Sequence, residues 1–356
     1  MRIAEWGDGV IGAIDIVWTA LGAILVTMFG VLFGLVFKGI DRVLSARMQA
    51  RIGPRIRQPF WDVAKLFSKE NILPENAVKW MFNAAPVLAL ASSAVMLLYL
   101  PLGPFAPLLH GHGDIILIMY LLLIPSLAMV TGGFASGSPY ASVGAQREMV
   151  MMMSYEFPLA AVIVSVAWKL RSLGIDNPFA LSTIAANPIW MNSGILGFIG
   201  VGILLVVLLI VTPAELSKIP FDAPEAETEI VGGLLAEYSG RNLGLFYLAD
   251  AVKTVVMGAL LVAIFFPWGI AGVFGLAAGS AGAVAADMGF FLAKLFAVLF
   301  VSVTVLRTSF ARLKIDQIVY MYWASLTIAA LFGLVLIIWD WNLSGMDWYN
   351  SILSGW

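Results

Sequence analysis

Eight long apolar stretches constrain what this chain can fold into more than any other feature of its sequence. Each is almost free of charge, and they cover approximately residues 16–37, 84–101, 115–134, 149–168, 194–212, 242–268, 289–306 and 318–339. A helix of about 20 residues crosses the hydrocarbon core of a bilayer, where only helices and closed barrels satisfy their backbone hydrogen bonds. No stretch alternates as a barrel strand does. The sequence therefore predicts an all-α integral membrane protein with eight transmembrane helices and a single membrane domain over residues 1–356.

Composition and the distribution of basic residues agree with this class. Charged residues make up 12% of the chain, whereas soluble domains carry about 25%. Fifteen of the 20 Lys and Arg residues fall in the alternate connectors 38–83, 135–148, 213–241 and 307–317. Basic residues favour the cytoplasmic side. We therefore expect a multi-pass protein of the cytoplasmic (inner) membrane, with connectors 38–83 and 213–241 inside, both termini outside, and the first apolar run retained as a helix.

The first cytoplasmic connector contains the stretch "PFWDVAKLFSK" (residues 59–69). Its apolar residues Phe60, Val63, Ala64 and Phe67 recur at helical spacing, which predicts a short amphipathic helix lying in the membrane interface. Trp61 suits the headgroup level. The basic residues before this helix are either determinants of orientation or part of a docking surface, and the sequence leaves both interpretations open.

Two glutamates occur at or inside the fourth apolar stretch. Glu148 and Glu156 are eight residues apart, so in a helix they share one face within about 80°. A carboxylate at membrane depth usually faces a partner, a cavity or an ion path. The alternatives are that Glu148 reaches the interface beside Arg147 and that Glu156 is a buried, hydrogen-bonded neutral acid.

Other ionisable residues within the apolar stretches lack an obvious role. Asp250 and Lys253 are three residues apart and can pair on one helix face, either structurally or functionally. Lys294 has no acid within one turn, so its partner must come from another helix or from water. His110 and His112 have only Asp114 nearby, and we predict no metal site. The chain has no cysteine, which excludes disulfides and thiolate ligation of iron–sulfur clusters by this chain.

Residues 214–238, "AELSKIPFDAPEAETEIVGGLLAEY", concentrate six acids in one connector. Three prolines, Pro213, Pro220 and Pro224, predict an irregular loop that leads into a helix. Such a loop either faces water or folds back into the protein, where non-helical backbone lines a hydrated cavity. In the second case its carboxylates form a funnel for cations. The six acids are Glu215, Asp222, Glu225, Glu227, Glu229 and Glu237.

Three motifs resemble the H-type membrane subunit of NADH–quinone oxidoreductase, the respiratory complex I. They are the acidic segment above, "ARMQARIGPRIRQPFWDVAKLFSKE" and "REMVMMMSYE", and their order and spacing agree over nearly the whole chain. The segment "GPRIRQP" is shorter than its counterpart in complex I. This short form, together with "RE" ahead of "YE", makes the chain more similar to the equivalent membrane subunit of energy-converting membrane-bound hydrogenases and related ferredoxin-linked sulfane reductase complexes. The resemblance implies a membrane-anchoring subunit that couples electron transfer in a peripheral arm to H⁺ or Na⁺ movement.

The resemblance also implies roles for individual residues. Combined with the ionisable residues of the spans, the expected ion pathway is Glu148, Glu156, Glu215, Asp222, Glu225, Glu227, Glu229, Glu237, Asp250, Lys253 and Lys294. Arg147 and Lys218 would tune these groups. The expected docking residues are Arg47, Arg51, Arg55, Arg57, Asp62 and Lys65.

No cofactor or nucleic acid is expected on this chain; iron–sulfur clusters and, in a hydrogenase, a nickel–iron centre would lie in hydrogenase-like or quinone-reductase-like partners. Small and antiporter-like membrane subunits would be further partners in the bilayer. The alternatives are the quinone-site membrane subunit of a quinone oxidoreductase and a stand-alone secondary transporter.

Overall fold

The structure is a computed structural model that describes residues 13–109, 114–191, 193–277 and 279–344. Within these residues, eight helical segments are long and apolar enough to span a membrane. They are Trp18–Met48, Lys79–Tyr99, Ile115–Ala135, Pro139–Ser172, Ile195–Glu215, Gly240–Phe265, Ala281–Ser309 and Ile315–Leu343. Each overlaps one predicted stretch, so the prediction of an all-α protein with eight spans is confirmed. His110 and His112, and both chain ends, lie outside the described residues.

Six spans are single helices, and two are interrupted by π-helical turns. The single helices are α1 (Ala13–Met48), α3 (Lys79–Tyr99), α4 (Ile115–Ala135), α5 (Pro139–Ser172), α7 (Ile195–Glu215) and α9 (Gly240–Phe265). The interrupted spans are α10 (Ala281–Leu299) with η3 (Phe300–Val305) and α11 (Leu306–Ser309), and α12 (Ile315–Tyr320) with η4 (Met321–Leu326) and α13 (Thr327–Ser344). The shorter elements are α2 (Gln58–Ser68), α6 (Leu181–Ala186), η1 (Ala223–Glu225), α8 (Glu227–Ile230) and η2 (Gly233–Leu235).

Two helices extend well beyond the apolar stretches that predict them. The first apolar stretch ends near residue 37 whereas its helix continues to Met48, and α5 begins at Pro139 rather than near residue 149. Apolar residues mark the part of a helix that lies in hydrocarbon, whereas the helix itself continues where its polar residues find partners in the protein or in water, as Asp41 and Glu148 do in buried contacts. As a result Arg147 and Glu148 lie inside α5, two turns from its start.

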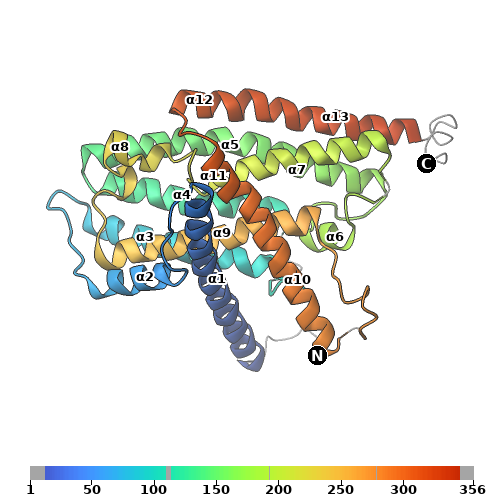
Figure 1. Ribbon diagram of the computed structural model, residues 1–356, viewed down its shortest axis with the longest axis horizontal. Helices are drawn as coiled ribbons and strands as arrows, with labels where there is room; N and C mark the ends of the chain where they lie inside the picture. Colours follow the sequence, from blue (N-terminus) through green and yellow to red (C-terminus); the bar gives the residue numbers. More distant parts are fainter. Residues whose placement is uncertain (1–12, 110–113, 192, 278, 345–356) are drawn as a thin grey trace.

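Most of the spans run side by side, while α1 and α10 cross them steeply (Figure 1). Helix α9 is the central element, since every residue from Ala251 to Phe265 is buried. Helix α1 crosses α9 closely at Gly34, where an added Cβ would lie 2.2 Å from the carbonyl oxygen of Ala251. This close crossing brings the next turn of α1 against Asp250.

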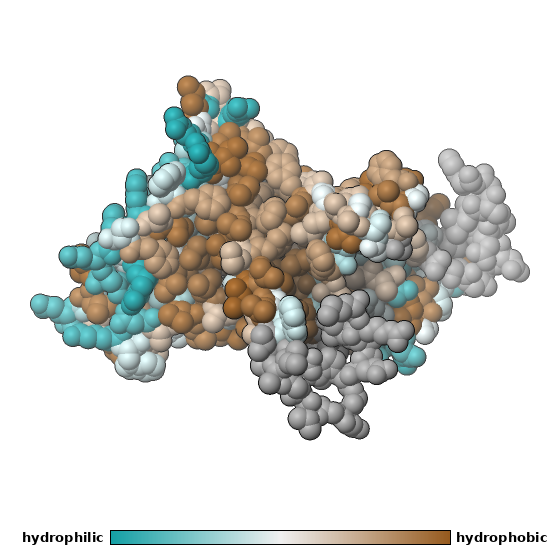
Figure 2. Space-filling view, turned by 90° about the horizontal axis from the view of Figure 1, so that it is seen from below, coloured by the Kyte–Doolittle hydropathy of each residue, from teal (hydrophilic) through white to brown (hydrophobic). Residues whose placement is uncertain are grey.

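Hydrophilic residues gather at the end of the molecule that carries α2 and α8 (Figure 2). The remaining surface in that view is largely apolar, as expected for helices in contact with lipid. The polar end holds the first connector and the acidic segment, which the sequence places on one side of the membrane.

The predicted amphipathic helix is present as α2, and an ion pair that the sequence does not predict determines its orientation. Asp62 turns towards the protein and pairs with Arg42 of α1 at 2.9 Å, while Phe67 and Trp61 are exposed. The helix packs against α9, where Leu66 and Phe67 approach Gly244. The ion pair with Arg42 determines this orientation, and periodicity within a short segment does not reveal a partner 20 residues away.

Candidate functional site

A buried ion pair lies where α7 and α9 meet. Lys253 of α9 places its Nζ 2.8 Å from Oε1 of Glu215, the last residue of α7. The two side chains are 7% and 1% exposed. Two charges removed from water are stable together only when their mutual attraction offsets the cost of desolvation. Either charge alone would therefore be strongly destabilising here.

Two hydroxyl groups extend the polar contacts of this pair to two further spans. Nζ of Lys253 donates to Oγ of Ser126 in α4 at 3.1 Å. Oγ of Ser126 lies 3.5 Å from the hydroxyl oxygen of Tyr155 in α5, and Tyr155 is fully buried. Hydroxyl groups both donate and accept hydrogen bonds, so α4, α5, α7 and α9 share one polar cluster.

Glu148 and Glu156 of α5 complete this buried cluster, which we define as Glu148, Glu156, Glu215 and Lys253 with the two hydroxyls. Oε2 of Glu148 and Oε1 of Glu156 are buried and have no hydrogen-bond partner among the described residues. Glu148 feels the charges of Lys253 and Glu215, and Glu156 that of Glu215. The carboxyls of Glu148 and Glu215 thus interact with the ammonium of Lys253, whereas Glu156 interacts with Glu215. An unpaired carboxylate in apolar surroundings is very costly. The cluster is most stable when its unpaired carboxyls hold protons.

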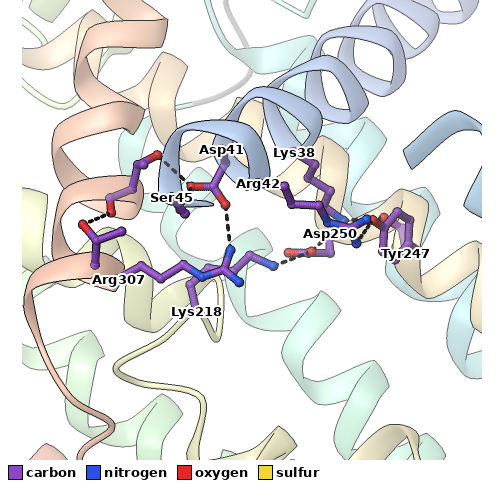
Figure 3. Close-up of polar contacts among 10 residues, drawn as sticks. Lys38, Asp41, Arg42, Ser45, Lys218, Tyr247, Asp250 and Arg307 are labelled. Atoms are coloured by element: carbon purple, nitrogen blue, oxygen red, sulfur yellow. Dashed lines mark hydrogen bonds and ion pairs between the residues drawn. The ribbon is translucent and has the colours of Figure 1, made fainter. Parts of the chain in front are cut away.

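A second group of charges lies between α1, α9 and the start of the acidic segment (Figure 3). Oδ2 of Asp250 is 2.6 Å from Nζ of Lys218 and 2.7 Å from Nζ of Lys38. Lys38 also donates to the carbonyl of Tyr247 at 2.9 Å and lies over its ring. One carboxylate oxygen therefore joins two helices and a loop, and we call Lys38, Lys218 and Asp250 the lysine–aspartate node.

The node continues towards the first connector through α1. Arg42 donates to the Tyr247 hydroxyl at 2.8 Å and to Asp62 of α2 at 2.9 Å. On the other side of α1, Oδ2 of Asp41 is 2.8 Å from Arg307 (Figure 3). Thr304 of η3 donates to Oδ1 of Asp41 at 2.7 Å. Helix α1 thus carries charged contacts from the interfacial helix to the interior.

Glu225 lies between the node and the buried cluster. Its carboxyl feels the charges of Lys218, Asp250, Glu148 and Lys38. Burial raises the pKa of Glu225 from 4.5 to about 7, although Lys218 opposes the shift. Burial alone would lower the pKa of Lys218, but Asp250 and Glu225 outweigh it and hold that pKa above its usual value. A group that titrates near neutral pH can exchange protons under physiological conditions.

Two arginines hold the acidic segment against the bundle. Arg312 donates from Nε to Oδ1 of Asp222 at 2.8 Å and from a terminal nitrogen to Oδ2, and it also donates to Thr228 at 2.9 Å. The hydrogen bonds to Asp222 raise the pKa of Arg312. Arg147 of α5 donates to Glu229 at 2.6 Å and to the carbonyl of Ala223 at 3.2 Å. Bidentate Arg–carboxylate contacts fix geometry as well as charge.

The backbone of the acidic segment is irregular, as its prolines predict. It contains η1, α8 and η2 with single turns between them. Gly233 has a positive φ of 51°, and a Cβ there would lie 2.0 Å from the carbonyl oxygen of Pro224. Only glycine fits such a close approach, which lets the segment fold back on itself against α5.

The six acids of this segment divide into inward and outward groups. Glu215 and Asp222 are buried, Glu225 and Glu237 are half-buried, and Glu227 and Glu229 are exposed. Of the two alternatives that the sequence left open, the first half of the segment therefore folds inward. Glu227, Thr228 and Glu229 of α8 reach the surface, whereas Ile230 of the same helix is buried.

The structure gives the partners of three ionisable residues in the spans, and one pair that the spacing permits is not formed. Asp250 and Lys253 do not pair with each other, because Asp250 faces α1 and Lys218 while Lys253 faces α4 and Glu215. As predicted, the partners of Lys294 come from outside its own helix: it donates to the carbonyls of Phe266 and Trp268, both at 2.6 Å, and it also feels the charge of Asp287. Helix neighbours, which sequence spacing does not reveal, decide these partners.

The basic residues of the first connector are exposed, and their role in docking stays a prediction. Arg47, Arg51, Arg55, Arg57 and Lys65 are all exposed. Asp62, which the resemblance places beside them, uses its carboxylate inside the chain. No group of three metal-ligating side chains occurs in the part of the chain that the structure describes.

Several contributing residues are not identified by the sequence. Lys38 and Asp41 belong to a basic connector, although Lys38, Asp41 and Ser45 recur at helical spacing and so share a face of α1. That spacing is an available signal. Ser126, Tyr155, Tyr247 and Arg312 give no sequence signal, because their role depends on helices that are distant in the chain.

The fold and the site define a multi-pass membrane protein with a connected network of buried titratable groups. The sequence model of the protein family described as NADH dehydrogenase matches residues 21–338 of this chain. The H subunit of the NADH-quinone oxidoreductase of Brevibacillus brevis is 33% identical over 337 residues, covering 90% of this chain and 92% of the relative. The H subunit of the same enzyme of Syntrophotalea carbinolica is 29% identical over 311 residues, covering 83% and 88%.

A solved structure is also similar. A chain of the membrane-bound sulfane sulfur reductase, an archaeal respiratory membrane complex, superposes with a TM-score of 0.77 at 29% identity. The match covers 90% of this chain and 99% of that chain. The protein belongs to the NADH dehydrogenase family, among its H-type membrane subunits. It is a membrane subunit of a multisubunit respiratory oxidoreductase complex of the complex I type.

Proposed function

We propose that this subunit couples electron transfer in a peripheral arm to proton movement through its buried titratable groups. The observation that carries the proposal is the buried cluster, in which Glu148 and Glu215 interact with the ammonium of Lys253 and Glu156 interacts with Glu215. Glu225 and the lysine–aspartate node connect this cluster to α1, and Arg42 connects α1 to Asp62 of α2. A charge change at the polar end can thereby alter the proton affinity of the buried carboxyls.

The ion is a proton rather than Na⁺ in this proposal. The ammonium of Lys253 already lies between Glu215 and Ser126. A second cation about 4 Å from it would meet a repulsion of about 4 kcal/mol at an effective dielectric constant of about 20. A proton adds no ion of that size, because it neutralises a carboxyl that is already present.

Ferredoxin is the proposed electron donor, with iron–sulfur clusters, and in a hydrogenase a nickel–iron centre, in the partner subunits. The similarity to the sulfane sulfur reductase supports this assignment, as does the short "GPRIRQP" segment. Arg47, Arg51, Arg55, Arg57 and Lys65 would contact the peripheral arm, and small and antiporter-like membrane subunits would flank the bundle. Glu227, Glu229 and Glu237 would lie at the entry of the path.

A quinone-site subunit is the second candidate, because the relatives in Brevibacillus and Syntrophotalea are NADH-quinone oxidoreductase subunits. Photoaffinity labelling with a quinone analogue separates the two. Labelling of the first connector would favour quinone reduction over the ferredoxin-linked assignment.

The test of the proposed function is Glu156→Gln in inverted membrane vesicles. We expect the complex to assemble and to transfer electrons from reduced ferredoxin, while the proton gradient falls to a small fraction of the wild-type value. Glu75→Gln, at an exposed acid outside the network, is the matched control and should pump normally. A normal gradient in Glu156→Gln would remove this residue from the path.

A further inference from the structure

The connection between α9 and α10 carries an exposed apolar surface that the proposed function does not use. Residues 272–277 are all exposed, with Val273 at 81%, Phe274 at 68% and Leu276 at 39%. No charged residue occurs between Lys253 and Asp287. Apolar side chains this exposed are unfavourable in water, and we call residues 270–277 the apolar turn.

Hydrogen bonds within the apolar turn satisfy much of its backbone. The N–H groups of Val273, Gly275 and Leu276 donate to the carbonyls of Ile270, Gly272 and Ala271 at 3.0, 3.2 and 3.1 Å. Asp287 of α10 accepts from Ile270 N–H at 2.7 Å and Ala271 N–H at 2.8 Å. Backbone groups that approach hydrocarbon must be bonded within the protein, and this turn meets much of that condition.

The residues at the base of the apolar turn are of the kinds that lie at lipid headgroups. Trp268 is 43% exposed. Lys294 donates to the carbonyls of Phe266 and Trp268, and its Nζ is 4.7 Å from the centre of the Phe290 ring. Tryptophan and lysine are enriched where the bilayer meets water, so the base fits the interface and the apex the lipid beside it.

A second connection at the same end of the bundle has the opposite character. The segment between α5 and α7 reaches the end of α9, because Trp190 donates to the carbonyl of Phe265 at 2.7 Å. This segment carries Asp176, whose side chain is 94% exposed. Two neighbouring connections thus differ in the solvent they suit: the first suits lipid and the second suits water.

We propose that the apolar turn inserts Val273 and Phe274 into the lipid leaflet at the end of the bundle opposite α2 and α8 (Figure 1). Asp287 and Lys294 hold its base, and the turn anchors the steeply inclined α10 to that leaflet. Its occupant is the bilayer, since the exposed side chains are uncharged and continue from the ends of two spans.

The chain has no cysteine, so single-cysteine spin labelling tests this directly. Phe274→Cys is labelled in the assembled complex in lipid nanodiscs, and collision with molecular oxygen is compared with collision with a water-soluble nickel chelate. Leu331→Cys, on the exposed face of α13, is the lipid reference, and Asp176→Cys is the water reference. Val273→Cys replaces Phe274→Cys if that variant does not assemble.

We expect the label at position 274 to favour oxygen over the nickel chelate, as at position 331. A preference for the nickel chelate, as at position 176, would place the turn in water and overturn the proposal. Shielding from both reagents would show that another protein subunit covers the turn, which also overturns it.

Discussion

Replacing Lys253 with methionine tests whether the buried ion pair stabilises the junction of α7 and α9. The two side chains have similar length, so the substitution removes a charge with little change in volume. Because the side chain of Glu215 is 1% exposed, the variant leaves a carboxylate without its partner. Breaking a buried ion pair on one side costs about 3–5 kcal/mol. We expect the free energy of unfolding to fall by that amount.

The double variant Lys253→Met with Glu215→Gln removes both charges. Replacing a buried ion pair by neutral groups of similar size is often close to neutral, so it should recover most of the lost stability. The coupling free energy between the two positions is then about 3 kcal/mol. Lys79→Met, at an exposed position in α3, is the matched control and should change stability by less than about 0.5 kcal/mol.

The assay is reversible unfolding of the purified subunit in mixed micelles of detergent and sodium dodecyl sulfate, followed by circular dichroism. Additive losses in the double variant would contradict the reasoning, because independent sites add whereas paired charges do not. A loss below about 1 kcal/mol in Lys253→Met would show that Glu215 does not depend on Lys253.

Two further predictions concern the acidic segment. Burial raises the pKa of Glu225 from 4.5 to about 7, so on raising the pH the unfolded chain ionises at this residue before the folded chain does. The free energy of unfolding of the wild type should therefore fall relative to that of Glu225→Gln as the pH rises from about 4.5 to about 7. This loss of unfolding free energy should reach about 3 kcal/mol, stay constant above about pH 7 and vanish below about pH 4.5. A difference between the two proteins that does not depend on pH in unfolding titrations would contradict this prediction. Arg312→Gln should lower the free energy of unfolding by about 1–3 kcal/mol and speed amide hydrogen exchange over residues 217–238. Lys314→Gln, at an exposed position, is the control and should do neither. Equal exchange in both variants would exclude Arg312 as the residue that holds the segment.

The spans are predictable because the hydrocarbon core imposes both a length and an absence of charge. The ends of the helices are less predictable. Helix α5 begins ten residues before the predicted stretch, and this extension packs against the protein through buried residues such as Gly144 and Glu148, which hydropathy does not reveal. The prolines of the acidic segment and its position between two spans leave two alternatives, an inward and an outward fold. The structure shows the inward fold for the first half of the segment. Hydropathy does not distinguish the buried Asp222 from the exposed Glu229.

Ion-pair partners are the least predictable feature of the site. Asp250 and Lys253 stand at a spacing that permits a pair, yet each finds a closer partner on another element. Lys38 belongs to a run of basic residues that orientation alone would explain, and its contact with Asp250 depends on the close crossing of α1 and α9 at Gly34. Such partners follow from helix packing, which one sequence does not encode in a readable pattern.

In the proposed function, the buried carboxyls exchange protons when electrons move in the partner subunits. Infrared difference spectroscopy of the assembled complex, triggered by reduction with ferredoxin, measures this directly through the carbonyl stretch of protonated carboxyl groups. We predict a deuterium-sensitive change in that band which is lost in Glu148→Gln and in Glu156→Gln. An identical band in wild type and both variants, or no change on reduction, would contradict the account.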